Sequence, residues 1–248
     1  MRSERKASTH RRSSSRKPTR VAAPKKLVFL FDVDNTLLDN DGVVGDLRKH
    51  LGNEVGRPRA NRYWKIFEQL REELGYADYL GALQRYRRKY PHDAHLLKVA
   101  HFLIDYPFAK RLFRDSLKVL QHAKRWGQVF LLSDGDVVFQ PHKIERSGLL
   151  KAVGERVLLY VHKQDELRDV QRRCHGDHYV VIDDKLHILT AIKKIWRRRV
   201  TTVFVRQGHY AHDRKILDSC PTADITIDRI GDLLKFAGSD FVPLFPGR

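Results

Sequence analysis

Pairs of acidic residues follow two apolar runs of this sequence, at the points where buried strands would end. Asp32 and Asp34 come directly after the run Leu27–Phe31, and Asp183 and Asp184 follow a later run. A carboxylate at a strand end can act as a nucleophile, as an acid or base, or as a ligand for a hard metal ion. Either pair alone could simply cap a helix, so a functional role is indicated only if other polar residues lie at neighbouring strand ends.

Two other apolar runs are also followed by polar groups. Ser133 comes after Gln128–Leu132, and Lys163 comes after Arg156–Val161. In a parallel sheet the carboxyl ends of the strands meet at one edge, and ligands bind beyond that edge. Four polar clusters after four apolar runs therefore predict one acidic site that contains a lysine and a hydroxyl.

The elements that must position these groups alternate along the chain. Short apolar runs, interpreted as buried strands, are separated by stretches whose apolar residues have helical spacing. The runs are Leu27–Phe31, Gln128–Leu132, Arg156–Val161, His178–Ile182, Val200–Val205 and Ala223–Ile227. Such alternation predicts βαβ units and an α/β fold with a Rossmann-like parallel sheet.

A long interval between the first two runs has no strand-like pattern. It holds three apolar faces with helical spacing, which begin at Tyr63, Tyr79 and Leu96 and end at Gly75, Pro91 and Pro107. We therefore expect an all-helical domain inserted into the sheet domain. The predicted bounds are 44–107 for the helical domain and 27–43 with 108–248 for the core. Residues 39–45, with Gly42 and Gly45, are predicted to be a flexible connection.

The order and spacing of the polar clusters resemble the haloacid dehalogenase-like (HAD) superfamily. The matching residues, in the order of that family's four motifs, are Asp32, Asp34 and Thr36 (DxDxT), then Ser133, then Lys163, then the pair Asp183 and Asp184. The resemblance extends from Leu27 to about Leu234. It implies the HAD fold, with the helical insert as a C1 cap that closes over the site.

The resemblance implies a magnesium-dependent phosphatase that acts on a small phosphorylated metabolite through an aspartyl-phosphate. Asp32 would be the nucleophile and a ligand of Mg²⁺. Asp34 would bind the metal through its backbone carbonyl, and its carboxylate would protonate the leaving oxygen and then activate water. Dehalogenases of the superfamily lack an acid at this position, so Asp34 favours phosphoryl transfer. A phosphotransferase or phosphomutase, which uses the same residue, stays open as an alternative.

Other matched residues would bind the phosphoryl group or the metal. By the resemblance, Ser133 and the backbone N–H groups of Asp134 and Gly135 would hold phosphoryl oxygens. Lys163 would neutralise charge on the nucleophile and the phosphoryl group. The fourth motif would supply two metal-binding residues, Asp184 as a direct ligand and Asp183 through water.

Several further residues allow two interpretations. Lys143 is an alternative for the lysine role, but it precedes the third run, so we expect it on a helix surface. Asp136 is interpreted as the cap of the helix that follows it. The insert offers four candidate pocket residues, Tyr63, Trp64, Tyr86 and Arg85. For the three aromatic residues, packing in the core of the helical insert is the favoured interpretation. Arg206, His209 and Tyr210 follow the fifth run and are equally compatible with substrate contact or with solvated surface.

Charge is spread unevenly over the 248 residues. Residues 1–26 hold ten basic residues and one acid, which is half of the formal net charge of +18. We expect this segment to be a disordered tail, with at most weak non-specific contact to nucleic acid, and a polyanion-binding protein stays open as an alternative function. The two cysteines lack metal-ligand spacing, and no signal-peptide or membrane pattern is present. These features predict a cytoplasmic monomer or weak dimer without membrane contact.

Overall fold

The computed structural model describes residues 26–242. The predicted disordered tail lies outside the described residues, except for Lys26. No helix in the described range is long and apolar enough to cross a membrane.

One six-stranded sheet forms the centre of the molecule. Its strands lie in the order β3-β2-β1-β4-β5-β6, and every neighbouring pair is parallel. The bounds are β1 Leu27–Phe31, β2 Gly127–Asp134, β3 Val157–Tyr160, β4 His178–Asp183, β5 Val200–Val205 and β6 Ile225–Ile227. The predicted α/β fold with a parallel sheet is confirmed. Strand β1 lies between β2 and β4, so the strands that carry three of the four motifs are neighbours.

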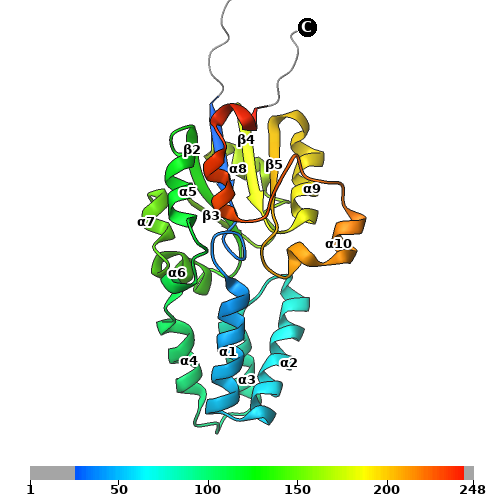
Figure 1. Ribbon diagram of the computed structural model, residues 1–248. Coiled ribbons are helices and arrows are strands. Elements are labelled where there is room, and N and C mark those ends of the chain that lie inside the picture. The colour runs from blue at the N-terminus through cyan, green and yellow to red at the C-terminus, as the bar shows by residue number, and fades with distance from the viewer. Residues whose placement is uncertain (1–25, 243–248) are drawn as a thin grey trace, which may run out of the picture.

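Helices cover both faces of the sheet (Figure 1). Alternate residues of the fully buried strand β1 enter two separate hydrophobic clusters, Phe29 and Phe31 on one face and Val28 and Leu30 on the other. The core helices are α5 Ser116–Ala123, α6 Phe139–Arg146, α7 Leu149–Val153, α8 Leu167–Arg173, α9 Leu186–Trp196 and α10 Arg214–Ser219. Short 3₁₀ helices span Phe108–Arg111, Arg197–Arg199, Tyr210–His212, Ile230–Lys235 and Gly238–Phe241. This burial on both faces explains why the strands read as continuous apolar runs.

Four helices form a separate unit beyond the carboxyl edge of the sheet, opposite the end from which β1 starts (Figure 1). They are α1 Asn40–Glu54, α2 Arg57–Leu74, α3 Tyr79–Lys89 and α4 Leu96–Asp105. The last three correspond to the three predicted helical faces. Helix α2 ends at Gly75, whose φ of +78° is the left-handed conformation that glycine adopts without strain.

Helix α1 was not predicted, and the predicted flexible connection at residues 39–45 is wrong. Gly42 and Gly45 lie inside α1, whose first turn is capped by Asp39 through a 2.8 Å bond from the N–H of Gly42. The sequence did contain a signal, because Val43, Leu47 and Leu51 are spaced four residues apart and are all buried. The domain bounds near residue 44 stay a prediction.

Candidate active site

The loop after β1 places two carboxylates at the carboxyl edge of the sheet. The N–H of Asp32 donates to the carbonyl of Ile182 in β4 at 2.9 Å, so the backbone of Asp32 is held against β4. The chain then turns tightly, with N–H groups of Leu37 and Leu38 both 2.9 Å from the carbonyl of Val33. The turn explains why Asp32 stays at the sheet while Asp34 points elsewhere.

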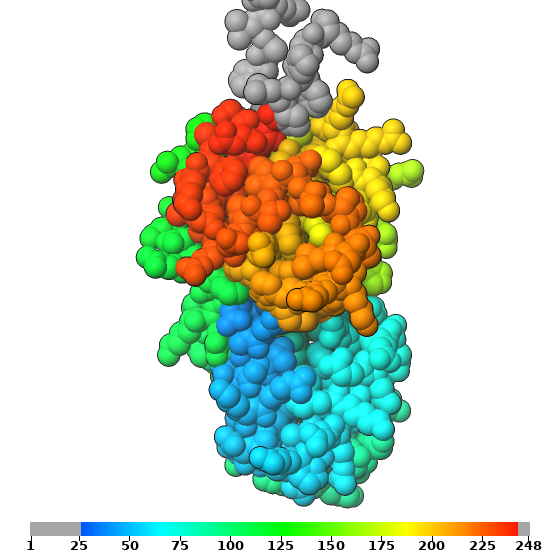
Figure 2. Space-filling view, turned by 45° about the vertical axis from the view of Figure 1, so that its right-hand side comes forward, coloured from blue at the N-terminus to red at the C-terminus, as the bar shows by residue number. Residues whose placement is uncertain are grey.

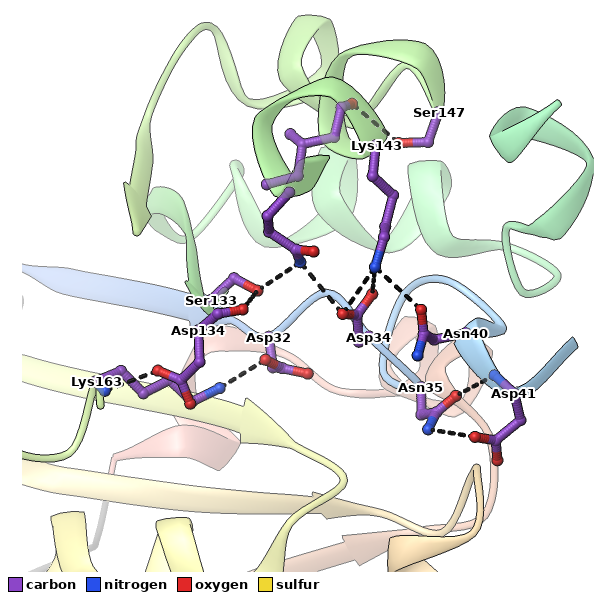
Figure 3. A network of polar contacts seen from close by, with 12 residues as sticks. Asp32, Asp34, Asn35, Asn40, Asp41, Ser133, Asp134, Lys143, Ser147 and Lys163 are labelled. Carbon is purple, nitrogen blue, oxygen red and sulfur yellow. Dashed lines mark hydrogen bonds and ion pairs between the residues drawn. The ribbon is translucent and has the colours of Figure 1, made fainter. Parts of the chain in front are cut away.

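Four charged residues form a buried group that we call the inner cluster: Asp32, Lys163, Asp183 and Asp184. None is more than 5% exposed. The Nζ of Lys163 lies 2.6 Å from Oδ1 of Asp32 and 2.6 Å from Oδ2 of Asp183. Figure 3 shows the contact with Asp32. The three strand ends after β1, β3 and β4 therefore converge, as the sequence predicted.

Burial shifts the protonation equilibria of the inner cluster. It raises the pKa of Asp32 to about 7, although Lys163 acts in the opposite direction. Burial, then the charges of Asp183 and Asp32, hold the pKa of Asp184 well above its ordinary value. Burial alone would lower the pKa of Lys163, but the carboxylates of Asp183 and Asp32 outweigh it and raise that pKa. Lys163 is therefore charged at neutral pH.

The inner cluster has the donor set for a divalent cation. One carboxylate oxygen from each of Asp32, Asp183 and Asp184 lies within 4.8 Å of the others. Oδ2 of Asp32 and both oxygens of Asp184 are buried and have no hydrogen-bond partner within residues 26–242. When all three carboxylates are ionised, one lysine leaves excess negative charge in a buried place, and a bound cation would balance it in place of protons. Hard cations prefer such oxygen ligands, so the residues fit Mg²⁺.

The end of β2 contributes a hydroxyl, from Ser133, and a fourth carboxylate, from Asp134. Ser133 is 1% exposed, and its Oγ accepts a 2.9 Å bond from the side-chain amide of Gln140. The carboxylate of Asp134 accepts a 2.7 Å bond from the backbone N–H of Lys163, and burial raises the pKa of Asp134. Asp134 thereby holds the backbone of Lys163, a contact that the sequence did not predict.

The backbone N–H of Gly135, which was predicted to bind a phosphoryl oxygen, already has a partner in the structure. It donates to the carbonyl of Tyr160 at 3.1 Å, so it is not free to bind a phosphoryl oxygen in this conformation. Asp136 does cap the helix that follows, because its Oδ1 accepts from the N–H groups of Val138 at 2.9 Å and Phe139 at 2.6 Å. The helix itself begins at Phe139, so the carboxylate of Asp136 caps the start of α6 from three residues upstream, while Val138 is the residue directly before the helix.

Asp34 points away from the inner cluster, toward helix α6 (Figure 3). Its two carboxylate oxygens lie 2.8 and 2.9 Å from the Nζ of Lys143, and Oδ2 also accepts a 3.3 Å bond from Gln140. Lys143 is 1% exposed, so its expected place on a helix surface is wrong. A signal existed, because Lys143 lies one turn after Phe139 on the buried face of α6.

A cavity of about 580 Å³ separates the sheet edge from the helical unit. Asp34, Lys143, Asp134 and Gly135 line its core side, and Trp64 and Tyr79 belong to the side formed by α2 and α3. Of the candidate pocket residues, only Trp64 lines this cavity. Tyr63 and Tyr86 are buried in packing contacts and Arg85 pairs with Glu73, so the packing interpretation holds for these aromatic residues.

The segment after β5 contacts the helical unit across the cavity. His209 donates its N–H to Asp41 at 2.8 Å, and its ring nitrogen Nδ1 lies 2.6 Å from the same carboxylate. The guanidinium of Arg71 donates to the hydroxyl of Tyr210. Figure 2 shows this segment, in orange, against the blue and cyan helices. We call the pairs Asp41–His209 and Arg71–Tyr210 the outer contacts.

Comparison with known proteins identifies relatives of solved structure. No family model and no curated protein matches the chain. A haloacid dehalogenase-like hydrolase from Burkholderia xenovorans LB400 is 57% identical, with a TM-score of 0.83, over 86% of this chain and all of that one. A magnesium-bound HAD hydrolase from Bacillus subtilis and an L-2-haloacid dehalogenase share the fold at 13% and 15% identity, with TM-scores of 0.55 and 0.60. Each match covers 85% of this chain and 98% of the other.

Proposed function

The chain belongs to the haloacid dehalogenase-like hydrolase family, and we propose that it is a magnesium-dependent phosphatase for a small phosphorylated metabolite. The observation that carries the proposal is a pair of carboxylates in one loop with different surroundings. Asp32 is buried beside Lys163, whereas Asp34, two residues later, lines the cavity. A haloacid dehalogenase needs no acid for a halide leaving group, so the second carboxylate supports phosphoryl transfer.

In the proposed reaction the carboxylate of Asp32 attacks phosphorus. An oxygen–phosphorus bond forms to Asp32 while the bond from phosphorus to the leaving oxygen breaks, and Asp34 gives its proton to that oxygen. Water then attacks the phosphorus of the aspartyl-phosphate, and Asp34 takes a proton from it. Free phosphate leaves and Asp32 is restored as a carboxylate, so one water is consumed in each turnover.

Lys163 and Ser133 are proposed to hold the phosphoryl group. Lys163 is fixed by Asp183 through its side chain and by Asp134 through its backbone, so its charge is preorganised beside the nucleophile. The hydroxyl of Ser133 has only a long 3.4 Å contact to the carbonyl of Asp134 as a donor. It can therefore turn its proton toward a phosphoryl oxygen at little cost.

Asp32, Asp184 and the backbone carbonyl of Asp34 are the proposed Mg²⁺ ligands. The unpartnered oxygens of Asp32 and Asp184 support this assignment. Asp183 already contacts Lys163 and accepts a 2.8 Å bond from the N–H of Lys185, which supports its acting through water. When bound, the cation would offset the repulsion between the anionic ester and the Asp32 carboxylate. The fold shared with a magnesium-bound hydrolase also supports this choice of metal.

Product analysis tests the proposal. The purified protein with Mg²⁺ is incubated with p-nitrophenyl phosphate, a panel of phosphorylated metabolites and 2-chloropropionate. We expect free inorganic phosphate from the esters and no chloride from the haloacid. Phosphate that moves to a second acceptor without release would identify a phosphotransferase or phosphomutase instead. Chloride release without phosphate release would identify a dehalogenase.

A further inference from the structure

Lys143 is a buried cation that the reaction steps above do not use. Its ammonium group lies 2.8 and 2.9 Å from the two oxygens of Asp34 and 3.0 Å from Oδ1 of Asn40. An ammonium group has three N–H donors, and these three acceptors match them. Lys143 is also only 1% exposed, although it borders the cavity. It therefore has no donor left for a substrate, and it can affect the reaction only through its partners Asp34 and Asn40.

The contact joins three elements that meet at the cavity. Lys143 comes from α6, Asp34 from the loop after β1, and Asn40 is the first residue of α1 (Figure 3). Gln140, one turn earlier on α6, bonds to both Asp34 and Ser133. A single buried helix face thus fixes the direction of the Asp34 carboxylate relative to Ser133 and to the start of the helical unit.

We propose that Lys143 is the positioning residue for Asp34: one carboxylate oxygen keeps its contact with the ammonium group while the other is released to face the leaving oxygen in the cavity. The inference rests on the proposed phosphatase function. Asp34 is 27% exposed and borders a cavity of about 580 Å³, so without Lys143 its side chain has room to turn into other rotamers. Loss of orientation lowers the effective concentration of an acid at the bond that breaks.

Leaving groups differ in how much they need that acid. An alkoxide is a poor leaving group and needs a proton during bond breaking, whereas p-nitrophenolate is stable without one. Positioning of Asp34 therefore matters for alkyl phosphates and little for p-nitrophenyl phosphate. General damage to the site would slow both substrates alike, so the two causes give different patterns.

The test compares Lys143→Met with wild type on glycerol phosphate and on p-nitrophenyl phosphate, using kcat/KM, which reports the steps up to transfer of the phosphoryl group. We expect a loss of about 100-fold for the alkyl ester, at the lower end of what general acid catalysis contributes, and less than about threefold for the aryl ester. Lys151→Met, an exposed lysine on α7, is the control and should leave both values unchanged. Equal losses on both esters would overturn the inference.

A double substitution shows whether Lys143 acts through Asp34. In an Asp34→Asn background, Lys143→Met should cause no further loss on the alkyl ester, because the two residues act as one unit. A further loss of tenfold or more would mean that Lys143 acts independently, which overturns the inference.

If Lys143→Met does not fold, Asn40→Ala removes one acceptor of the ammonium and should give the same selective pattern at smaller size. Equal small losses on both esters would again be contrary evidence. Wild type that releases no phosphate from either ester overturns the proposed function itself, and the inference with it.

Discussion

The inner cluster and the outer contacts place charged and polar side chains in opposite surroundings. In the inner cluster Lys163 bridges Asp32 and Asp183 among residues that are at most 5% exposed and come from rigid strand ends. In the outer contacts Asp41 is 35% and Arg71 is 37% exposed, and both border the cavity. The inner charges are thus held by buried strand ends, whereas the outer contacts join the core to the helical unit at partly exposed positions. On the proposed function, the first arrangement would hold the nucleophile in place and the second would allow the site to open.

The largest effect is expected at the nucleophile of the inner cluster. Asp32→Asn should keep the fold and lose more than about 100-fold of turnover, since an amide cannot attack phosphorus and covalent catalysis is worth several powers of ten. Phosphate release with Mg²⁺ measures the loss. Asp228→Asn, at a side chain that is 79% exposed, is the control and should keep full turnover. More than about a hundredth of wild-type activity in Asp32→Asn would show that the nucleophile lies elsewhere.

Removal of the metal should reduce turnover almost as much as the loss of Asp32, and variants of the inner cluster and of the outer contacts should differ in their response to Mg²⁺. A chelator should abolish turnover, Mg²⁺ should restore it, and Ca²⁺ should inhibit because its coordination shell is larger and looser. Mg²⁺ should also raise the Tm of wild type, since a ligand that binds only the folded state stabilises it. Asp184→Asn should lose most of that rise, whereas Asp41→Asn, in the outer contacts, should keep it. Undiminished turnover in excess chelator is incompatible with the metal assignment.

The outer contacts should govern opening of the helical unit. Residues 39–45 cap and begin helix α1, and with the segment near Pro107 they link the core to the helical unit. Hydrogen exchange with and without beryllium fluoride should show protection on binding at both links. The two links lie together, because the N–H of Asp39 donates to the carbonyl of Arg111 at 2.7 Å. Exchange that is equal in both states would argue against closure.

The hydroxyl of Tyr210, on the core side of the cavity, provides a second test of whether the helical unit closes over the site. Tyr210→Phe removes the acceptor of the Arg71 bond but keeps the ring, so the closed state should be less populated. We expect KM to rise about two- to fivefold with little change in kcat, as expected for a lost hydrogen bond of about 1 kcal/mol. Tyr160→Phe is the matched control, since its hydroxyl bonds to Asp169 within the core. Unchanged KM in Tyr210→Phe would remove this contact from the closing mechanism.

A smaller effect is expected in the dependence of stability on pH. In metal-free protein the pKa of Asp32 is raised from 3.8 to about 7, so between these values the folded state holds a proton that the unfolded state releases. Stability contributed by this group is therefore lost as pH rises from about 4 to 7. The Tm of metal-free wild type should fall more over that window than the Tm of Asp32→Asn. Calorimetric curves that stay parallel would contradict the shift.

Much of the inner cluster could be predicted from the sequence because its geometry follows from topology. Parallel strands end at one edge, so Asp32, Lys163 and Asp184 had to meet once the strands were identified. The direction of Asp34 could not be predicted, since it depends on Lys143, which is 109 residues away in sequence. A fully buried lysine is rare, so the ordinary expectation places it on the surface.

Two other differences have local causes. Helix α1 was not predicted because Gly42 and Gly45 each disfavour a helix by up to about 1 kcal/mol. In the structure, burial of its apolar face and the cap by Asp39 outweigh this cost. The N–H of Gly135 is used by Tyr160, a contact set by where β3 ends beside β2. The apolar face of α1 can be found in the local sequence at Val43, Leu47 and Leu51, whereas the end of a neighbouring strand cannot.

The smallest effect on catalysis is expected from the basic N-terminal segment, which belongs to neither region. The structure gives a precise place to cut, because the backbone of Lys26 contacts Asp177: its N–H donates to the carboxylate at 2.9 Å and its carbonyl accepts from the N–H at 2.9 Å. Removal of residues 1–25 leaves these bonds and strand β1 in place. Melting temperature and turnover of a small ester should therefore hardly change.

What the truncation should change is salt-sensitive attraction to polyanions. Residues 1–25 hold nine of the ten basic residues of the segment, and such side chains displace counterions from a phosphate backbone. The attraction should show little sequence preference, because no aromatic residue lies among these charges to stack on bases. The measurement compares full-length and truncated protein in DNA binding at two salt concentrations, beside Tm and turnover. A truncated protein that melts much lower, or that loses turnover, would show that the segment packs on the core.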